Sequence, residues 1–339
     1  MSERLAFRPD ASRARDLDLR MRSRLGDSLA YIADEVRGRL PVSQDRVGAF
    51  LERLALAPVS SIVFGAYCDL VLALEAGDLR AAAGLFDEIV SAPVSPEALS
   101  IRAIGDPDRE TEANRYVRLI NTDPSMVVVL RPPSPELEAV ARQRLEAALR
   151  LLDQGFPELA DEIRALVREI ILAVNEEHSP IRVDGASSFM LWGAIIVNAE
   201  LGRTRLELVQ GLAHESGHNL LFGLCADGPL VENDDFDRFD SPLRADPRPM
   251  DGIVHAAYIV ARMHQAVDTV LKAEVLEPDE ADAARLTLTN HSQAFWRGMD
   301  TIDKHGRLTA LGHDVIEGAR NYMSAAADVG RRHRQPQTS

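Results

Sequence analysis

Two histidines four residues apart, His214 and His218, lie with Glu215 in the stretch LVQGLAHESGHNLLFG, residues 208–223. A helix advances about 100° per residue, so side chains four positions apart project from one face, about one turn apart. Both imidazoles can therefore reach one metal ion. Glu215 is turned about 100° away, where it can hydrogen-bond a metal-bound water. The spacing predicts a metal-binding helix.

The residues around these histidines are apolar on almost every side of the predicted helix. A buried histidine needs a hydrogen-bond partner or a metal ion, because burying an unsatisfied polar group costs free energy. Two core histidines bonded to backbone carbonyls are the purely structural explanation. The apolar flanks and the strand expected before the helix favour a metal site. These flanking residues are Leu206, Leu208, Val209, Leu212, Ala213, Leu220, Leu221 and Phe222.

A catalytic metal site needs a third protein ligand. Glu232 follows His218 after fourteen residues, in a stretch without helical periodicity. The acidic residues that follow Glu232 are typical of a solvent-exposed loop. Glu232 and Asp237 nevertheless remain alternative candidates for the third metal ligand. His255 opens an otherwise apolar stretch with helical periodicity, and this pattern favours His255 as the third ligand. Tyr258 and Arg262 share its helical face.

The order of these motifs resembles a known enzyme family. HESGHNLLF, followed by SPLRADPRPMDGIVHAAYIVARM at residues 241–263, is similar to the HExxH-type 2-oxoglutarate-dependent peptide β-hydroxylases. These enzymes occur in gene clusters for ribosomally synthesised and post-translationally modified peptides. Ser187-Ser188 and Trp192-Gly193-Ala194 before the helix, and LTALG at residues 308–312, extend the resemblance over roughly residues 175 to 320.

The resemblance implies an iron(II) site formed by His214, His218 and His255, with 2-oxoglutarate and O₂ as cosubstrates. Three protein ligands on one face leave three positions open for the cosubstrates. The usual oxygenase triad has a carboxylate in place of one histidine, so this set departs from the common pattern. Glu215 would orient a ligand or a bound water. The substrate would be a precursor peptide, hydroxylated at a β-carbon.

The distal carboxylate of 2-oxoglutarate needs a cation, and arginine suits it because it can donate two hydrogen bonds. Arg244 in the SPLR segment is the first choice, with Ser241 as an added hydroxyl donor. Arg262 is the second choice, with Tyr258 beside it. A loop salt bridge from Arg244 to a nearby aspartate is the structural alternative.

Two other functions fit the same residues. In a zinc metallopeptidase, Glu215 would activate water, and the strand near Ile195–Val197 would bind the substrate backbone by β-augmentation. The thermolysin-type glutamate on a following helix is missing. In a non-catalytic scaffold, the chain would bind a peptide and use the metal structurally, although structural zinc sites often use cysteine and only Cys225 is near.

The composition excludes some classes of partner. A formal net charge of −15 argues against nucleic acid as a partner, because phosphate contacts need a basic surface. No apolar run is long enough to span a bilayer, and the N-terminal residues lack a signal-like apolar segment. Two cysteines imply no disulfide framework. We therefore expect a cytoplasmic protein, and the sequence carries no indication of its oligomeric state.

The periodicity predicts a mainly α protein with a small β-sheet, an α+β fold. Residues 1–174 are expected to form a helical N-terminal region for support and possible peptide binding. Residues 175–325 form the metal-binding catalytic region, and residues 326–339 a disordered tail.

The sequence also predicts the secondary structure of three particular segments. Residues 126–135 are β-branched and end at a proline pair, which predicts a strand. Residues 157–174 are expected to be helical. The metal helix, residues 204–224, is expected to pack beside a short edge-strand sheet that ends near Asn198.

Overall fold

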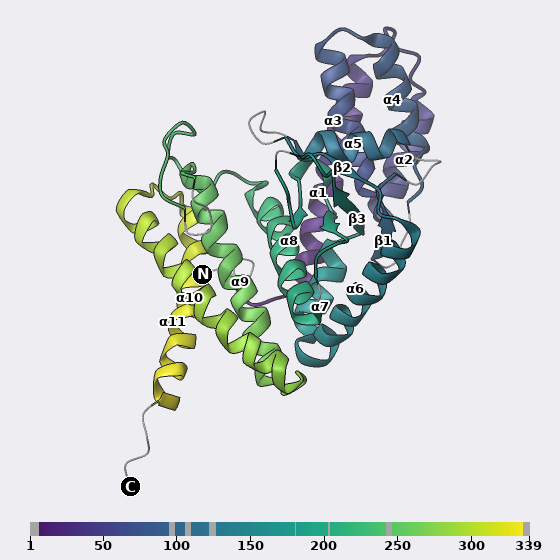
Figure 1. Ribbon diagram of the computed structural model, residues 1–339. Coiled ribbons are helices and arrows are strands. Elements are labelled where there is room, and N and C mark those ends of the chain that lie inside the picture. The colour runs from purple at the N-terminus through teal and green to yellow at the C-terminus, as the bar shows by residue number, and fades with distance from the viewer. Residues whose placement is uncertain are drawn as a thin grey trace. The chain divides into compact units, whose positions relative to one another are not determined.

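The computed structural model describes residues 7–94, 99–105, 110–121, 127–179, 181–202, 204–241 and 246–334. Within these ranges the protein is mainly α-helical with a small five-stranded sheet (Figure 1), which confirms the predicted fold class. None of the helices in the described ranges combines the length and the apolar character needed to span a lipid bilayer.

The chain forms two compact units. The first contains Met1–Asp10, Ala147–Asp161 and Thr204–Ser339, and the second contains Ala11–Glu146 and Glu162–Arg203. This division differs from the boundary expected at residue 174. The predicted metal helix lies in the first unit and the strands lie in the second, so packing of that helix beside the sheet stays a prediction.

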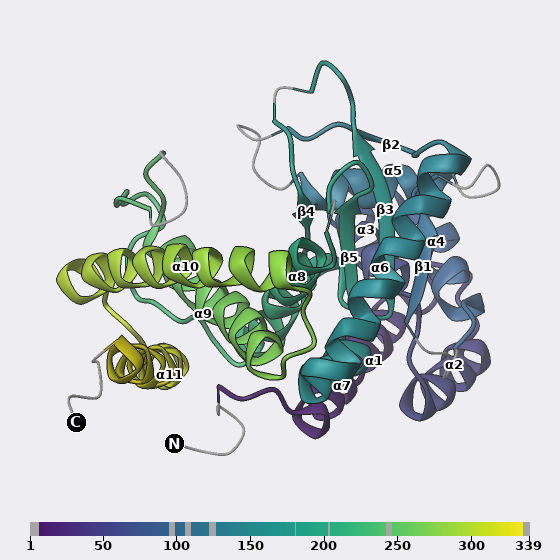
Figure 2. The ribbon, with the colours of Figure 1, turned by 60° about the horizontal axis from the view of Figure 1, so that its bottom comes forward.

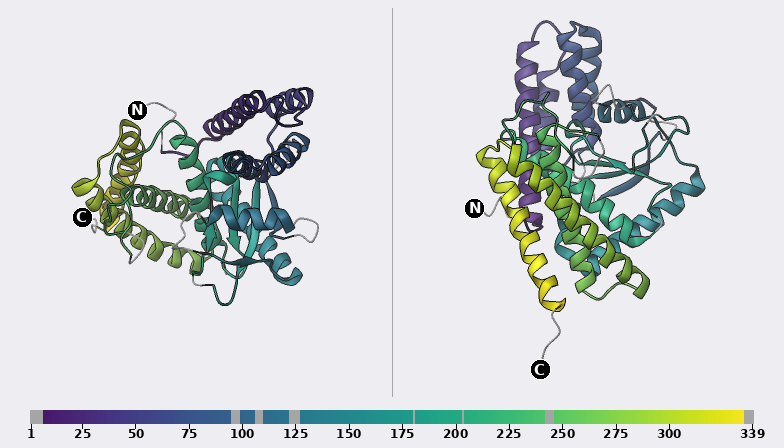
Figure 3. Two further views of the ribbon diagram at one scale, coloured as in Figure 1. Left: turned by 90° about the horizontal axis from the view of Figure 1, so that it is seen from above. Right: turned by 60° about the vertical axis from the view of Figure 1, so that its left-hand side comes forward.

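The second unit begins with four helices. The last two are separated by a short turn at Gly77-Asp78, and they pack against each other (Figure 3). Asp78 ends the turn between them, because its carboxylate accepts a hydrogen bond from the Ala81 backbone N–H at 2.9 Å. The helices are α1 (Ala11–Glu35), α2 (Gln44–Leu56), α3 (Ser61–Glu75) and α4 (Leu79–Ser91), and α5 (Glu110–Ile120) follows later.

The sheet is built around β3 (Glu169–Asn175), which lies among the other strands (Figure 2), and all residues of β3 are buried. It pairs in parallel with β1 (Ser100–Ala103) and β5 (Ala194–Asn198), and antiparallel with the two-residue strand β2 (Leu130–Arg131). The predicted helix over residues 157–174 was wrong in its second half, since α7 (Pro157–Leu166) ends before β3. A strand buried on both faces has a continuous apolar sequence, and periodicity does not separate it from a buried helix.

β5 lies inside the sheet rather than at its edge. β3 pairs with one side of β5, and β4 (Gly185–Ala186) pairs with the other at Ile196 and Val197. The backbone of these two residues is therefore already paired on both sides. The peptidase interpretation, in which the strand near Ile195–Val197 receives a substrate strand, was wrong on this point. The short helix η3 (Phe189–Leu191) connects β4 to β5.

The first unit is arranged around α9 (Met250–Lys272). This helix packs against α8 (Arg205–Cys225), α10 (Pro278–His305) and α11 (Ala310–Arg334). A buried cluster of Leu206, Val267 and Ala284 joins three of them. Because α11 continues to Arg334, residues 326–334 are helical, which corrects the predicted tail; residues 335–339 lie outside the described residues. Residues of α6 (Pro135–Gly155) and α7 belong to both units.

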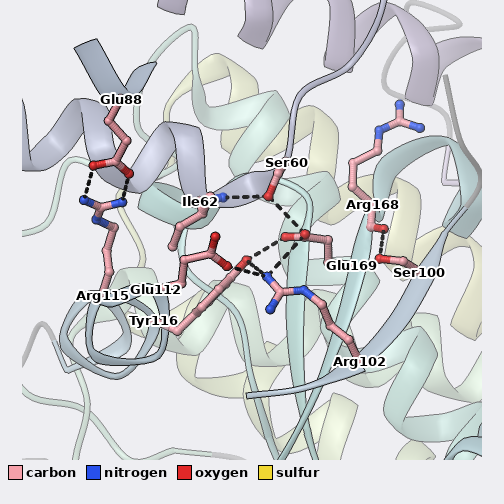
Figure 4. A network of polar contacts seen from close by, with 10 residues as sticks. All are labelled: Ser60, Ile62, Glu88, Ser100, Arg102, Glu112, Arg115, Tyr116, Arg168 and Glu169. Atoms are coloured by element: carbon pink, nitrogen blue, oxygen red, sulfur yellow. Dashed lines mark hydrogen bonds and ion pairs between the residues drawn. The ribbon is translucent and has the colours of Figure 1, made fainter. Parts of the chain in front are cut away.

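A buried polar network holds the first residue of β3 in the second unit (Figure 4). The Glu169 carboxylate accepts hydrogen bonds from the Tyr116 hydroxyl at 2.6 Å and the Ser60 hydroxyl at 3.0 Å, and Arg102 of β1 lies 3.4 Å away. Burial, followed by the charge of Glu169, raises the pKa of Tyr116 well above its usual value. The hydroxyl therefore stays protonated and donates. The network joins α3, α5, β1 and β3.

We expect Tyr116→Phe to lower the free energy of unfolding by about 1–3 kcal/mol, because a buried carboxylate loses its shortest hydrogen bond. Tyr31→Phe is the matched control, since Tyr31 is 66% exposed. Urea titration of both variants measures the difference. A Tyr116→Phe value within 0.5 kcal/mol of the control would contradict the role given to this network.

Candidate metal centre

The start of α8 is fixed by local capping and by an ion pair. The Thr204 hydroxyl accepts from the Glu207 backbone N–H at 3.1 Å, and the Glu207 carboxylate accepts from the Thr204 N–H at 3.3 Å. Such a capping box satisfies two amide groups that have no partner within the helix. Arg205 donates two hydrogen bonds to Glu280 of α10, at 3.1 and 2.6 Å. The helix predicted over residues 204–224 is therefore confirmed and held in place at its first turn.

α8 and α9 come into close contact beside the two histidines of α8. A Cβ atom at Gly217 would lie 2.7 Å from Ile259 Cδ1 and 3.9 Å from Arg262 Cβ. Both of those residues are fully buried on α9. Glycine at this position lets the helices approach, because any larger side chain would displace Ile259.

This approach brings three imidazole rings together. The ring centroids of His214 and His218 are 5.0 Å apart, and those of His218 and His255 are 6.0 Å apart. Phe222 lies beside the set, 6.1 Å from His218 and 6.4 Å from His255. The three residues proposed from the sequence as ligands therefore lie next to one another, two on α8 and one on α9.

The spacing of the rings can be compared with that of a ligand set. Imidazole nitrogens bind at roughly 2.1 Å from the metal, so two rings on one ion have centroids roughly 4.5–5.5 Å apart. The His214–His218 pair meets this range, and the His218–His255 pair is wider. Across the described residues, no group of three or more His, Cys, Asp or Glu side chains is arranged to hold a metal ion. Closing the set requires the His255 ring to approach His218.

The surroundings keep the inner rings neutral. Burial lowers the pKa of His218 well below its usual value, and the neighbouring His214 and His255 add to this effect. Burial also lowers the pKa of His255, and the negative charge of Asp251 partly opposes this effect. Asp251 Oδ1 lies 3.7 Å from His255 Nε2. The neutral form is the one that binds metals. The side chain of His214 is 33% exposed, so the set is open to solvent on that side.

Two side chains lie against the His214 ring. Its Nε2 is 3.9 Å from Oε1 of Glu215, a buried carboxylate, and its Nδ1 is 3.4 Å from the sulfur of Met263 on α9. Glu215 is thus on the Nε2 side of the ring. A carboxylate there can hydrogen-bond a water bound to a metal at Nε2.

The residues expected to bind 2-oxoglutarate have different surroundings. Arg262 is buried, donates from Nη1 to the Phe7 backbone carbonyl at 3.1 Å and has its guanidinium 5.9 Å from the Phe7 ring centroid. Tyr258 packs edge-on against the same ring at 5.4 Å. Ser241 is half-buried, and Arg244 lies outside the described residues.

The alternative ligands Glu232 and Asp237 are both exposed. The backbone N–H of Glu232 donates to the Arg307 carbonyl at 2.7 Å, which pairs this loop with the connection between α10 and α11. Within the described part of the chain, neither carboxylate joins the three histidines in a group that could hold a metal ion.

Sequence reasoning missed two residues near His214. Met263 was given no role from the sequence, since a thioether has no distinctive spacing signal. His291 of α10 is buried, and its Nδ1 has no hydrogen-bond partner among the described residues. Burial lowers the pKa of His291 to about 4, with contributions from His264 and His214. The sequence offers no clear signal for His291, because it lies in a polar stretch, TNHSQ, and its burial is seen only in the structure.

No protein-family model matches this sequence, and no curated protein shows significant sequence similarity to it. The motif resemblance and the geometry of the three histidines therefore carry the functional argument.

We expect Gly217→Ala to separate α8 from α9 and to weaken binding of Co(II), used as a probe metal, by roughly tenfold or more, because the added methyl displaces Ile259. Gly211→Ala on the same helix is the control, since nothing lies within 4 Å of a Cβ there. Ile259→Val removes the Cδ1 atom and should restore binding in the Gly217→Ala background. Unchanged affinity in Gly217→Ala, or no rescue, would contradict the close-contact argument.

Proposed function

We propose that the protein is an iron(II)- and 2-oxoglutarate-dependent oxygenase that hydroxylates a β-carbon in a ribosomally made precursor peptide. The observation that supports it is the juxtaposition of His214, His218 and His255, predicted from motif order and found on adjacent faces of α8 and α9. The family resemblance over residues 175 to 320 supplies the reaction class.

When bound, iron(II) with 2-oxoglutarate and O₂ supplies the oxidising power for hydroxylation of a C–H bond. The chain contributes three imidazoles, two of which are kept neutral by burial. A histidine binds a metal in its neutral form, so three such ligands would leave the charge of the ion for a dianionic cosubstrate to offset. The exposed side of His214 provides a route for the peptide to approach.

In this proposal Arg244 binds the distal carboxylate of 2-oxoglutarate, and the Ser241 hydroxyl donates a second hydrogen bond to it. Arg262 is the weaker candidate, because its guanidinium already donates to the Phe7 carbonyl and is buried under the Phe7 ring. Releasing it would cost the free energy of a charge-assisted hydrogen bond. Tyr258 holds the same Phe7 ring and so supports this arrangement.

A zinc metallopeptidase is the second candidate. The observation that favours it is the buried Glu215 carboxylate on the Nε2 side of His214, the position a general base needs. Two observations count against it: Ile196 and Val197 of β5 are paired on both sides, and Glu232 is exposed.

We expect His255→Ala to lower the affinity for iron(II) by roughly 10²-fold or more, because two ligands bind a metal weakly. His264→Ala, which removes another buried histidine of α9, should keep its iron, since His264 Nδ1 contacts the Tyr322 hydroxyl at 2.9 Å instead. Metal analysis of anaerobically purified protein measures both. Full iron content in His255→Ala would overturn the assignment, and tightly bound zinc in the wild type would favour the peptidase.

Glu215→Gln separates the two candidates. In a peptidase, Glu215 must accept a proton from metal-bound water, so activity would fall by about 10²–10⁴-fold. In the proposed oxygenase no carboxylate base is needed at the oxidised carbon, so the variant should keep its iron and a measurable share of hydroxylation.

Mass spectrometry checks this result on a precursor peptide. A product heavier by one oxygen, formed with succinate and without cleavage, supports the oxygenase. Peptide cleavage by the wild type that is lost in Glu215→Gln would refute it.

A further inference from the structure

The described residues that precede α1 are held in the first unit by one buried side chain. Phe7 is 5% exposed, whereas Arg8 and Asp10 are exposed and Pro9 is half-buried. Residues 7–10 have no helical or strand structure, and they belong to the first unit with α9 and α11. A segment with a single buried side chain is bound in the way that a short peptide binds through one anchor residue.

Three side chains surround the Phe7 ring, and we call them the Phe7 cage. Tyr322 of α11 stacks on the ring, with centroids 5.3 Å apart and 24° between the planes. Tyr258 of α9 meets it edge-on, at 5.4 Å and 79°. Both arrangements are favourable for aromatic pairs at these separations. The guanidinium of Arg262 lies 5.9 Å from the ring centroid, within the range of a cation–π contact.

The cage also binds the backbone of the same residue. Arg262 Nη1 donates a hydrogen bond to the Phe7 carbonyl at 3.1 Å. Tyr258 and Arg262 are four positions apart on α9, so they project from one face of the helix. One face of α9 therefore recognises an aromatic side chain and the carbonyl next to it, two features that any peptide with an aromatic residue possesses.

The walls of the cage are held by contacts that do not involve Phe7. The Tyr322 hydroxyl lies 2.9 Å from His264 Nδ1 and 3.4 Å from Asp268 Oδ2, both on α9. The stem of Arg262 lies against α8, since its Cβ and Cγ are each 3.9 Å from the position of a Cβ at Gly217. The cage therefore stays formed when Phe7 leaves, and a site formed in advance binds a ligand at a small cost in ordering.

We propose that the Phe7 cage is a binding site for an aromatic residue of a peptide, which the chain's own residues 7–10 occupy and from which a second peptide displaces them. Burial of one phenylalanine side chain changes an equilibrium by roughly 10- to 150-fold. The segment can therefore leave its site while the helices stay folded, as chain ends commonly do. This inference goes beyond the proposed function and requires neither the metal nor the reaction.

The tether sets the concentration at which exchange occurs. A site next to its own ligand on a short flexible connection experiences an effective concentration on the order of millimolar. The chain's own segment therefore excludes a peptide that is present at micromolar concentration, and a peptide present above the effective concentration replaces it. Removing the Phe7 side chain removes this competition.

Fluorescence anisotropy tests the site with one probe, a labelled peptide of this chain's residues 2–12, SERLAFRPDAS. Phe7→Ala protein should bind this peptide at least tenfold more tightly than the wild type does. The same peptide with alanine in place of its phenylalanine should bind Phe7→Ala protein at least tenfold more weakly. Phe236→Ala is the matched control and should behave like the wild type, since Phe236 is 88% exposed. Equal affinity for Phe7→Ala and the wild type, or equal affinity of the two peptides, would overturn the proposal.

A second measurement keeps the cage intact and decides the question even where Phe7→Ala fails to fold. Phe7→4-fluorophenylalanine gives a ¹⁹F signal from the buried ring, and Phe236→4-fluorophenylalanine gives the reference for an exposed ring. Unlabelled peptide at roughly 5–10 mM, above the effective concentration of the tethered segment, should move the first signal toward the reference. The peptide that carries alanine should leave it unchanged. A signal that keeps its buried position at the highest peptide concentration would show that Phe7 is a fixed core residue and would refute the exchange.

Discussion

The close contact between α8 and α9 at Gly217 is the constraint on which the candidate site depends. A Cβ atom there would lie 2.7 Å from Ile259 Cδ1, so the present separation of the helices leaves no room for a side chain at residue 217 unless Ile259 moves. That separation brings His255 within 6.0 Å of His218, ring to ring, and the Met263 sulfur within 3.4 Å of His214. Many apolar residues of α9, among them Ile253, Val254 and Ala257, are fully buried. A site assembled in this way has the rigidity of two packed helices rather than that of a loop.

Part of this arrangement was readable from the sequence because helical periodicity decides which side chains share a face. The spacing of His214 and His218 predicted one face of α8, and an isolated histidine in an apolar stretch indicated His255. Gly217 could not be recognised in this way. From the sequence alone, a glycine inside a helix only predicts a less stable helix, and its packing role becomes visible once the neighbouring helix is known. Met263 could not be identified for a different reason: its apolar stem fits a core pattern, and its sulfur contacts a residue 49 positions away along the chain.

The fold was less predictable where burial removes the periodic signal. β3 is buried on both faces, and its sequence EIILAVN has no polar alternation. It was therefore read as a continuation of the helix before it. The partners of Glu169 also escaped sequence reasoning, because Ser60, Arg102 and Tyr116 are far from it along the chain. The start of α8, in contrast, was predicted to within one residue. The two residues that cap it, Thr204 and Glu207, are only three positions apart in the sequence.

The charge distribution around the three histidines bears on which chemistry the site suits. Burial favours the neutral form of His218 and of His255, and the thioether against His214 carries no charge. Glu215 and Asp251 are the carboxylates in contact with this set among the described residues, each 3.7–3.9 Å from a ring nitrogen. Such carboxylates can orient a bound water or a ring without occupying a coordination position. A divalent ion in this setting would attract an anionic, chelating ligand more strongly than a neutral peptide carbonyl. Such an ion would therefore suit the dicarboxylate cosubstrate of the proposed oxygenase better than direct polarisation of an amide bond.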